Sequence, residues 1–340
     1  MKAELSVIIP VFKMGNYLKT AVDSVLCQTL KEIKVYLVDD GSPDESAAIC
    51  DQYAAADPRV VVLHRQNGGL SAARNTALEL LDTPYVTFLD GDDCIAEAGA
   101  YEYILGQMKR NDADMALYGY RRFADGETPE ILTGEIVPGQ VLFFDKPKLI
   151  EWLCENVSAS HPLIVWNKMY RSSLFQNARF EEGNLVEDSR IIPDLYRAAN
   201  RFVRINHPMI LYRMRPGSQS NYRSPKLCCD HALSTMGVYD FAKETGYTEY
   251  QREAAIHWAK GFFTDYYTVL FDKKKDETKE EKNYRKFIAA TMRTYFARMY
   301  PELRKNAKLS KGQSFCCSLF RKIPRLATKL AKRWNAFERL

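Results

Sequence analysis

Short apolar runs alternate with segments of helical periodicity through the first 120 residues of the chain. Runs of this length are typical of buried strands, whereas apolar residues that recur every three or four positions indicate helices. The strand-like runs lie at residues 6–12, 33–38, 60–63, 85–89 and 115–119. Strands that alternate with helices predict an α/β fold of Rossmann-like type with a mostly parallel sheet.

Polar residues follow three of these runs, at the points where the predicted strands end. Asp39 and Asp40 follow the second run, residues 67–69 (Asn-Gly-Gly) follow the third, and residues 90–93 (Asp-Gly-Asp-Asp) follow the fourth. In open α/β sheets, ligands bind at the edge formed by the carboxyl ends of the strands. We therefore expect these polar groups to gather in one crevice.

The acidic cluster Asp90, Asp92 and Asp93 is the strongest chemical signal in the chain. Side chains alternate along extended backbone, so Asp90 and Asp92 can point the same way, and Gly91 lets a ligand or ion approach the backbone. Three carboxylates this close repel one another and favour a shared Mg²⁺ or Mn²⁺ ion, which usually also holds substrate phosphates. An isolated cluster of this kind could be a solvated turn, but its place at the sheet edge favours a metal site.

Start and stop signals place two helices between these strands. Ser42 as N-cap, Pro43 at the first helical position and Glu45 closing a capping box predict a helix after the second strand. A second helix is predicted over residues 71–81.

A G-x-G-x-x-G turn is missing after the first strand, which argues against a dinucleotide-dependent oxidoreductase. The lack of a glycine-rich phosphate loop at the same point argues against a sugar nucleotidyltransferase.

The C-terminal third is predicted to be helical, and its end is strongly basic. From residue 302 onward Glu302 and Glu338 are the only acidic residues, against Arg304, Lys305, Lys308, Lys311, Arg321, Lys322, Arg325, Lys329, Lys332, Arg333 and Arg339. One predicted helical face, interrupted at Pro324, carries Phe315, Leu319, Ile323, Leu326, Leu330, Trp334 and Phe337. A basic amphipathic helix of this kind suits an anionic membrane surface. The alternative is a helix docked on the protein's own core.

Length and composition favour a cytoplasmic protein. The chain has 340 residues, no apolar run of about 18 residues and no signal-peptide pattern. Its eight cysteines are scattered without a C-x-x-C pair, which favours reduced, mostly structural thiols. With the basic tail, these features predict a peripheral protein on the inner face of the cell membrane and no nucleic-acid partner, since the basic residues gather in a tail with an apolar stripe.

Several motifs occur in order over residues 4–220: Ser6–Phe12, Val38–Ser42, Asn67–Asn75, Phe88–Asp93, Trp166-Asn167-Lys168, Glu187-Asp188 and the arginine-rich segment 213–218. Together they closely resemble the motifs of family 2 glycosyltransferases. The resemblance implies a GT-A fold, a nucleotide-sugar donor, a divalent metal and inversion at the anomeric carbon.

The resemblance also implies roles for individual residues around the donor. Pro10 and Phe12 would line the nucleobase pocket, and Asp40, with Asp39, would bind the base or ribose. The turn from Asn67 to Gly69 and the side chain of Arg74 would border the nucleotide, although Arg74 can equally pair with a neighbouring carboxylate. Asp92 is the first choice as ligand of Mn²⁺ or Mg²⁺, and Asp90 would reach ribose or a metal-bound water. Asp93 is the third candidate metal ligand of the acidic cluster.

On the acceptor side, Asp188 occupies the position of the family's general base. Its neighbour Glu187 points about 100° away on a helix, so both cannot serve equally. On residues alone, the pair reads as an acidic helix start favoured by the helix dipole. Trp166 would stack on a sugar or belong to the core. Lys168, Arg213 and Arg215 would hold a diphosphate or an anionic acceptor, or form ion pairs.

These expectations combine into a GT-A catalytic domain over residues 1–222, with a nucleotide half (1–120) and an acceptor half (121–222). A helical region (223–310) and a basic tail helix (311–340) follow. The predicted activity is inverting transfer of a hexose or N-acetylhexosamine, from a UDP-sugar to a hydroxyl of a glycan or lipid-linked acceptor, in surface polysaccharide synthesis. A weakly active or inactive partner subunit of a polysaccharide-synthesis complex is the alternative.

Overall fold

The computed structural model describes residues 2–133, 136, 139–216, 223–272, 276–306, 308–333 and 336. The chain divides into two compact units. The first comprises Met1–Leu149, Leu163–Gly183 and Asp194–Ser218, and the second comprises Ile150–Pro162, Asn184–Pro193 and Gln219–Leu340. Two short segments from the predicted acceptor half therefore group with the C-terminal helices.

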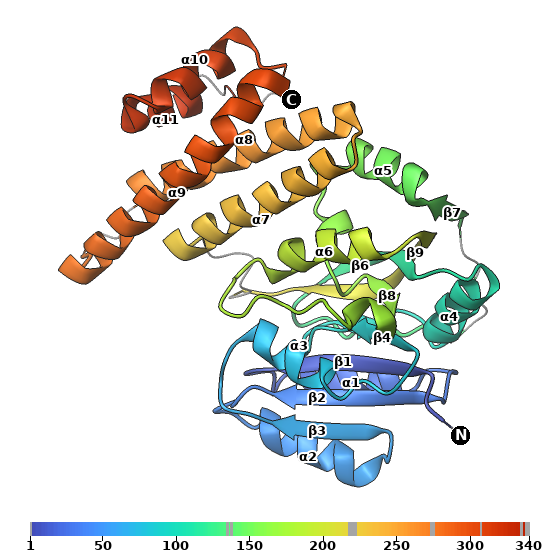
Figure 1. Cartoon of the computed structure of the whole chain (residues 1–340). Coiled ribbons are helices and arrows are strands. Elements are labelled where there is room, and N and C mark those ends of the chain that lie inside the picture. Colours follow the sequence, from blue (N-terminus) through green and yellow to red (C-terminus); the bar gives the residue numbers. More distant parts are fainter. Residues whose placement is uncertain are drawn as a thin grey trace. The chain divides into compact units, whose positions relative to one another are not determined.

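The first unit is built on one nine-stranded mixed sheet. Its strands are β1 Leu5–Val11, β2 Ile33–Asp39, β3 Val60–His64, β4 Tyr85–Phe88, β5 Cys94–Ile95, β6 Met115–Ala124, β7 Val141–Asp145, β8 Lys168–Arg171 and β9 Arg201–Met214. The strand order is β3-β2-β1-β4-β8-β6-β9-β5, and β7 also pairs with β9. Strands β1 to β4 run parallel, as the alternating sequence predicts. In Figure 1, the blue strands β1, β2 and β3 at the base belong to this parallel half, and β4 is drawn in teal.

Helices connect the parallel strands and continue through the rest of the chain. In the first part they are α1 Leu18–Leu26, α2 Ser46–Ala56, α3 Leu70–Leu78 and α4 Ala100–Arg110; α5 Lys146–Glu155 and α6 Glu187–Ala198 follow. Two short 3₁₀ turns lie at His161–Leu163 and Ser172–Phe175. This arrangement confirms the predicted α/β class with a helical C-terminal extension.

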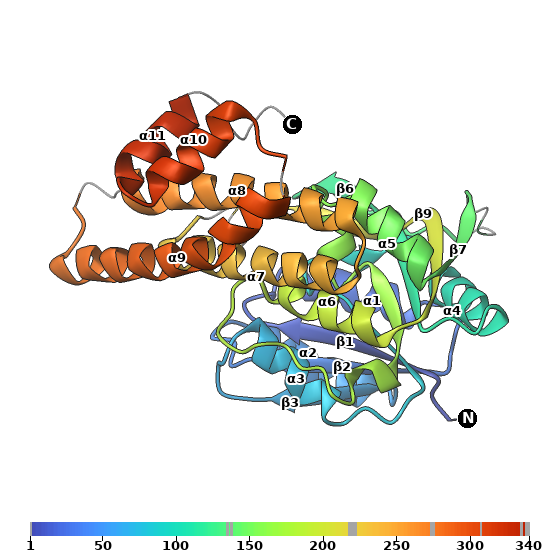
Figure 2. The same ribbon diagram turned by 45° about the horizontal axis from the view of Figure 1, so that its top comes forward.

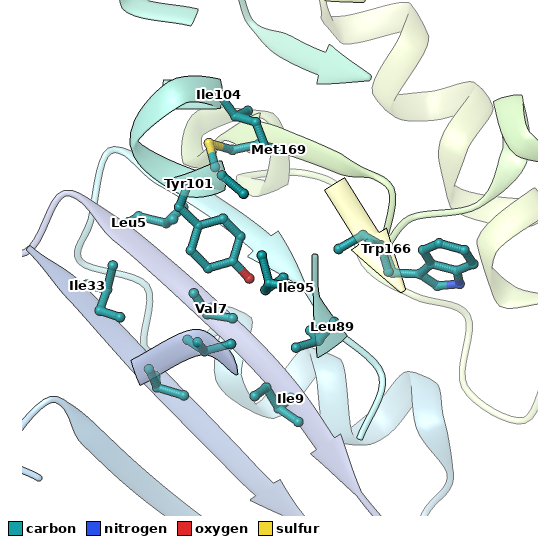
Figure 3. Close-up of a cluster of buried hydrophobic side chains, with 14 of the residues drawn as sticks. Leu5, Val7, Ile9, Ile33, Leu89, Ile95, Tyr101, Ile104, Trp166 and Met169 are labelled. Atoms are coloured by element: carbon teal, nitrogen blue, oxygen red, sulfur yellow. The ribbon is translucent and has the colours of Figure 1, made fainter. Parts of the chain in front are cut away.

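One core lies between the sheet and its helices (Figure 3). Leu5, Val7 and Ile9 of β1 point to the same face of the sheet, because side chains alternate along a strand. Tyr101 and Ile104 of α4 close over that face and are at most 1% exposed. Strands β1, β2 and β4 are thus buried as near-continuous apolar runs, whereas the edge strand β3 is partly exposed.

The predicted start of the helix after β2 is wrong. Helix α2 begins at Ser46, and its N-cap Glu45 makes no side-chain capping bond. Ser42 and Asp44 are used elsewhere: Ser42 Oγ accepts from the backbone N–H of Lys13 (3.3 Å), and Asp44 accepts from that of Gly15 (3.2 Å). These side chains hold the loop that follows β1, which the local capping pattern could not reveal.

The second unit is helical. Its main helices are α7 Pro225–Glu244, α8 Thr248–Phe271, α9 Lys279–Asn306, α10 Lys311–Phe320 and α11 Pro324–Arg333. Helices α7, α8 and α9 contact one another, and α11 packs on α8 (Figure 2). Aromatic contacts join these helices. The ring centre of Phe296 in α9 lies 5.3 Å from that of Phe262 in α8 and 4.4 Å from that of Phe320 in α10. Among the described residues, no helix is both long and apolar enough to cross a bilayer.

The predicted single tail helix is also wrong. Helix α10 ends at Phe320, and a separate helix, α11, begins at Pro324. Proline suits a first helical turn but not a helix interior. Phe320 of α10 is 2% exposed against the helical core, whereas Phe315 and Ile323 are each 50% exposed. One face of the tail, which includes Phe320, is therefore docked on the protein's own helices, whereas Phe315 and Ile323 are exposed on another face. Trp334 and Phe337 of the predicted apolar face lie outside the described residues.

Candidate active site

Asp40 organises the turn that follows β3. Its carboxylate, 3% exposed, accepts from the backbone N–H groups of Gly68 (3.0 Å) and Gly69 (2.7 Å) and from the guanidinium of Arg65. The Asn67 amide donates to the Asp40 carbonyl at 2.9 Å. Gly69 has a φ of +89°, a conformation that other residues rarely adopt. The ends of β2 and β3 are thus brought together, as the sequence predicts.

Asp39 is the centre of a second network at the same edge. It is 4% exposed; Oδ1 accepts from the backbone N–H of Ser42, and Oδ2 lies 3.0 Å from Nδ1 of His64. The other His64 nitrogen lies 3.0 Å from Asp51. Burial raises the pKa of Asp39, but the hydrogen bonds from Ser42 and His64 outweigh it and leave that pKa below its usual range.

The end of β1 packs against the acidic cluster. A side-chain carbon on Gly91 would lie 3.3 Å from the carbonyl oxygen of Pro10 and 3.2 Å from Met14. In this structure the absence of a side chain at Gly91 thus serves packing against the end of β1 rather than leaving room for a ligand. Phe12 is 38% exposed, and the ammonium of Lys13 lies 5.1 Å from its ring centre.

Arg74 pairs with the first carboxylate of the cluster. Its guanidinium is 1% exposed, lies 2.9 Å from Asp90 Oδ1 and contacts the rings of Phe88 and Phe180 at 5.8 and 5.2 Å. The carboxylate-pairing alternative for Arg74 is therefore the geometry observed. A buried arginine held in this way fixes the orientation of Asp90.

The other two carboxylates meet arginines from β9 and the residues after it. Antiparallel pairing of β5 with β9 sets Cys94 opposite Leu211, and this register brings the preceding aspartates next to the end of β9. Arg215 Nε lies 2.5 Å from Asp92 Oδ2, and Arg213 donates its backbone N–H to Asp93 at 2.9 Å. Arg213 Nε also donates to the Asp92 carbonyl at 3.0 Å.

The mutual repulsion of the aspartates is relieved without all three sharing an ion. Arg74 and Arg215 neutralise Asp90 and Asp92. Asp93 is 1% exposed, and burial, with the neighbouring charges of Asp90 and Asp92, raises its pKa well above the usual range. The described residues contain no group of three or more His, Cys, Asp or Glu side chains arranged to hold a metal. A metal site that includes all three carboxylates stays a prediction.

A smaller ligand set still fits a divalent cation. Asp90 and Asp92 are partly exposed, with 27% and 16% of their side chains accessible. Mg²⁺ is commonly bound by one or two carboxylates together with substrate phosphates. Asp92, with Asp90, can supply that set, whereas buried Asp93 is held by the backbone of Arg213.

Sequence reasoning missed residues that complete this edge. His64 is the last residue of β3 and pairs with Asp39, and Arg65 follows the strand and pairs with Asp40. Both could have been found as polar residues at a strand end. Tyr17 lies against two guanidinium groups, with its ring centre 5.0 Å from Arg213 and 5.3 Å from Arg215. No local signal marks Tyr17, because its partners lie about 200 residues further along the chain.

Two tentative acceptor residues lie in the interior of the first unit. Trp166 is 7% exposed; it stacks on Tyr212 at 5.3 Å and meets Tyr120 edge-on at 5.0 Å. Lys168 is fully buried, and its ammonium donates to the Ile164 carbonyl and, at 2.7 Å, to Asn167. Trp166 thus belongs to the core, which was the alternative expected for it, and Lys168 supports the loop before β8 through its hydrogen bonds.

Asp188 lies in the first turn of α6, in the segment that belongs to the second unit. Its side chain is partly exposed, whereas that of Glu187 is 7% exposed. The acidic helix start predicted from the sequence is therefore present. The role of Asp188 as a base stays a prediction.

The fold and this edge define a GT-A-type protein of the α/β class. Residues 6–181 match the model of glycosyl transferase family 2, and the chain belongs to that family. It is 33% identical over 234 residues to glycosyltransferase GlyA of Streptococcus pneumoniae serotype 4 (strain ATCC BAA-334 / TIGR4), covering 68% of this chain and 33% of GlyA. It is 32% identical over 218 residues to the uncharacterized glycosyltransferase EpsJ of Bacillus subtilis (strain 168), covering 63% of this chain and 62% of EpsJ.

Among solved structures, the chain is similar to residues 1–349 of S. aureus TarS in complex with UDP-GlcNAc. The TM-score is 0.57 at 18% identity, over 86% of this chain and 90% of that one. This likeness shows the fold. The chain spans only a third of GlyA and 62% of EpsJ, and its family match ends at residue 181, before Asp188.

The His64–Asp39 pair predicts a pH dependence of stability. The hydrogen bond to Asp39, followed by the one to Asp51, raises the pKa of His64 above its ordinary value of about 6.5. The folded protein therefore binds a proton more tightly than the unfolded chain. This contribution is complete below about pH 6.5 and is lost as the pH rises through the folded-state pKa.

We expect His64→Gln to lower the melting temperature by about 1–3 °C at pH 5.5 and by less at pH 8.5, since half-exposed pairs contribute roughly 0.2–1 kcal/mol. Thermal denaturation of both proteins across this range measures the difference. A constant difference at every pH would show that the charge of His64 contributes nothing.

Proposed function

We propose that this protein is a metal-dependent, inverting glycosyltransferase that moves a hexose or N-acetylhexosamine from a UDP-sugar to a hydroxyl of a glycan or lipid-linked acceptor. The observation that carries the proposal is the Asp90–Asp92 pair, held by Arg74 and Arg215 at the carboxyl edge of the parallel half of the sheet. Family membership supports the reaction class. The fold shared with TarS, whose structure holds UDP-GlcNAc, supports a UDP-sugar donor.

The donor nucleotide would lie over the ends of β1, β2 and β3. Pro10 and Phe12 at the end of β1 would border the base, and Asp39 and Asp40 the base and ribose. The Asn67–Gly69 turn is exposed and is already held by Asp40, which presents its backbone at the rim. A turn fixed before binding loses little conformational freedom when the nucleotide arrives.

Asp92, with Asp90, would hold Mn²⁺ or Mg²⁺. A bound cation would supply Lewis acidity that neutralises the negative charge on the departing diphosphate. Arg215 pairs with the Asp92 carboxylate, and the Arg213 side chain donates to the Asp92 backbone carbonyl, so both would add positive charge beside the diphosphate. Arginine suits this role because its planar donors match phosphate oxygens.

Asp188 would take the proton of the acceptor hydroxyl as that oxygen attacks the anomeric carbon. In an inverting transfer the nucleophile approaches from the face opposite the leaving group, so the base belongs on the acceptor side. The partly exposed Asp188 suits this task better than the buried Glu187.

The basic C-terminal helices would hold the enzyme on an anionic membrane surface, on the cytoplasmic face. Residues 303–333 include ten lysines and arginines and no acidic residue. Three apolar side chains of α10, α11 and their link are strongly exposed, namely Phe315, Ile323 and Leu326. Exposed apolar side chains among basic residues are the pattern of an interfacial helix.

A panel of nucleotide-sugars tests the donor assignment. We expect one UDP-sugar, with Mn²⁺ or Mg²⁺, to raise the melting temperature by roughly 5–10 °C, since a ligand at 100 times its Kd stabilises by about 2.7 kcal/mol. Differential scanning fluorimetry measures the shift. Asp40→Asn, which weakens the hold on the Asn67–Gly69 turn, should reduce it, and a shift confined to GDP-sugars would overturn the choice of UDP.

A further inference from the structure

A cavity lies within the helical unit, and none of its lining residues is assigned above to sugar transfer. It has a volume of about 680 Å³ and opens between α8, α9 and the link from α10 to α11. Its basic lining residues are Lys282, Arg285, Lys286, Arg293, Lys322 and Arg325. Among the described residues, Glu277 is the one acidic residue that lines it, and Tyr266, Leu270, Ala289, Ile323 and Pro324 complete the wall.

The single carboxylate is already neutralised. Glu277 is 8% exposed, and Arg285 binds it through Nε at 2.7 Å while donating a further bond to the Val269 carbonyl at 3.0 Å. Within the part of the chain that the structure describes, no carboxylate forms an ion pair with the other five basic residues of this cavity. The cavity therefore carries an uncompensated positive charge of about five.

Two of these cations converge on a buried phenol. Tyr266 is 1% exposed; burial raises its pKa, and the charges of Arg293 and Arg325 oppose that rise. Arg293 and Arg325 come from α9 and α11, so the positive charge is focused in the cavity rather than spread along one helix. Charges gathered in a concave site raise the local concentration of anions.

A smaller cavity of about 470 Å³ continues the basic lining. It shares Arg293 and Pro324 with the first cavity and adds Arg304 and Arg321. The Arg321 guanidinium lies 4.9 Å from the ring centre of Tyr300. Five arginines thus border two neighbouring cavities: Arg285, Arg293, Arg304, Arg321 and Arg325.

Apolar side chains project beside these cations. Ile323 lines the first cavity and is 50% exposed, and Leu326, one turn along the chain, is 44% exposed. Lys322 and Arg325 are their immediate sequence neighbours. In an anionic phospholipid the phosphate lies next to the acyl chains. Basic side chains beside exposed aliphatic side chains can therefore contact both parts of such a lipid.

We propose that this cavity binds the phosphate of an anionic phospholipid headgroup while Ile323 and Leu326 enter the acyl region. The inference rests on the proposed membrane contact and makes it specific, because a cavity recognises one headgroup whereas a charged helix responds to the whole surface. A nucleic-acid or soluble phosphate ligand would leave the exposed Ile323 and Leu326 unused.

The full-length protein is tested by flotation with phosphatidylcholine vesicles, with and without phosphatidylglycerol. Wild type should bind only the anionic vesicles, and Lys286→Gln/Arg293→Gln should bind them roughly 10- to 30-fold more weakly, from about 1 kcal/mol per basic residue. Both side chains are exposed, so folding should be unaffected. The control Lys19→Gln/Arg110→Gln removes the same charge from exposed positions of the first unit and should bind like wild type.

Soluble ligands separate the cavity from the surface. Short-chain phosphatidylglycerol, below its micelle concentration, should raise the melting temperature of wild type and of Leu326→Ser but not of the double cavity variant. Leu326→Ser should still lose vesicle binding. An equal effect of inorganic phosphate would overturn the choice of a lipid.

The two proposals fail in different ways. If the double cavity variant binds vesicles like wild type while Leu326→Ser does not, the cavity is excluded and the membrane contact stands. If wild type does not bind anionic vesicles, both are excluded. Nucleotide-sugar stabilisation, measured on every variant, reports independently on the donor site.

Discussion

Asp92→Asn is expected to reduce sugar transfer by roughly 10²- to 10³-fold, because it removes the charge proposed to hold the metal beside the leaving diphosphate. The substitution keeps the shape of the side chain, and its amide oxygen can still accept from Arg215 Nε. Only the charge of this ion pair is lost, so the melting temperature should fall by no more than a few degrees.

Initial rates measured across a range of Mn²⁺ and Mg²⁺ concentrations test this expectation. Asp82→Asn is the matched control, since it breaks the exposed ion pair with Lys34 and lies outside the proposed site. The control should keep the metal dependence of wild type. Equal rates and equal metal dependence in Asp92→Asn would exclude the metal assignment.

Asp188→Asn is expected to lower transfer by about 10²- to 10⁴-fold, the range in which general bases contribute, while donor binding persists. The donor should still raise the melting temperature of the variant, because the residues proposed to hold it lie on the strand ends of the first unit. Single-turnover transfer and donor-induced stabilisation, measured together, separate catalysis from binding.

Glu187→Gln is the paired control for Asp188→Asn. Adjacent helical residues point about 100° apart, so one of the two carboxylates should carry the effect. If Glu187→Gln abolishes transfer and Asp188→Asn does not, the assignment of the base is reversed. If neither changes transfer, the base lies on another element.

The parallel half of the sheet could be predicted from the sequence because its signals are local. The apolar runs of β1, β2 and β4 are buried on both faces, and these runs and that of the edge strand β3 stand out in any short window. Their polar ends then follow from chain order, and the pairing of Asp40 with the Asn67–Gly69 turn agrees with that prediction.

Strand β9 could not be predicted in this way. It runs over fourteen residues, contains Pro208, and its pairing with β6 shifts register on both sides of Gly119. Proline and a broken alternation argue against a strand when only neighbouring residues are considered. Its position is decided by pairing with β5, β6 and β7, which are distant in sequence.

The prediction of a helix cap at Ser42, after β2, failed for a related reason. Ser42 is a residue type that caps helices, but the loop after β1 offers it the backbone N–H of Lys13, 29 residues away. Short polar side chains bind whichever backbone donor the fold presents, so composition alone does not choose the partner.

The sequence by itself determined that carboxylates gather where parallel strands end, because hydrophobic periodicity and strand polarity are properties of short segments. Tertiary structure decided what those carboxylates meet: Arg74 holds Asp90, Arg215 holds Asp92, and burial leaves Asp93 with a raised pKa. Residues 16 to 123 positions apart form these pairs. Electrostatic energy depends on the distance between charges and on their burial. For residues far apart in the sequence, both quantities are set only when the sheet has formed.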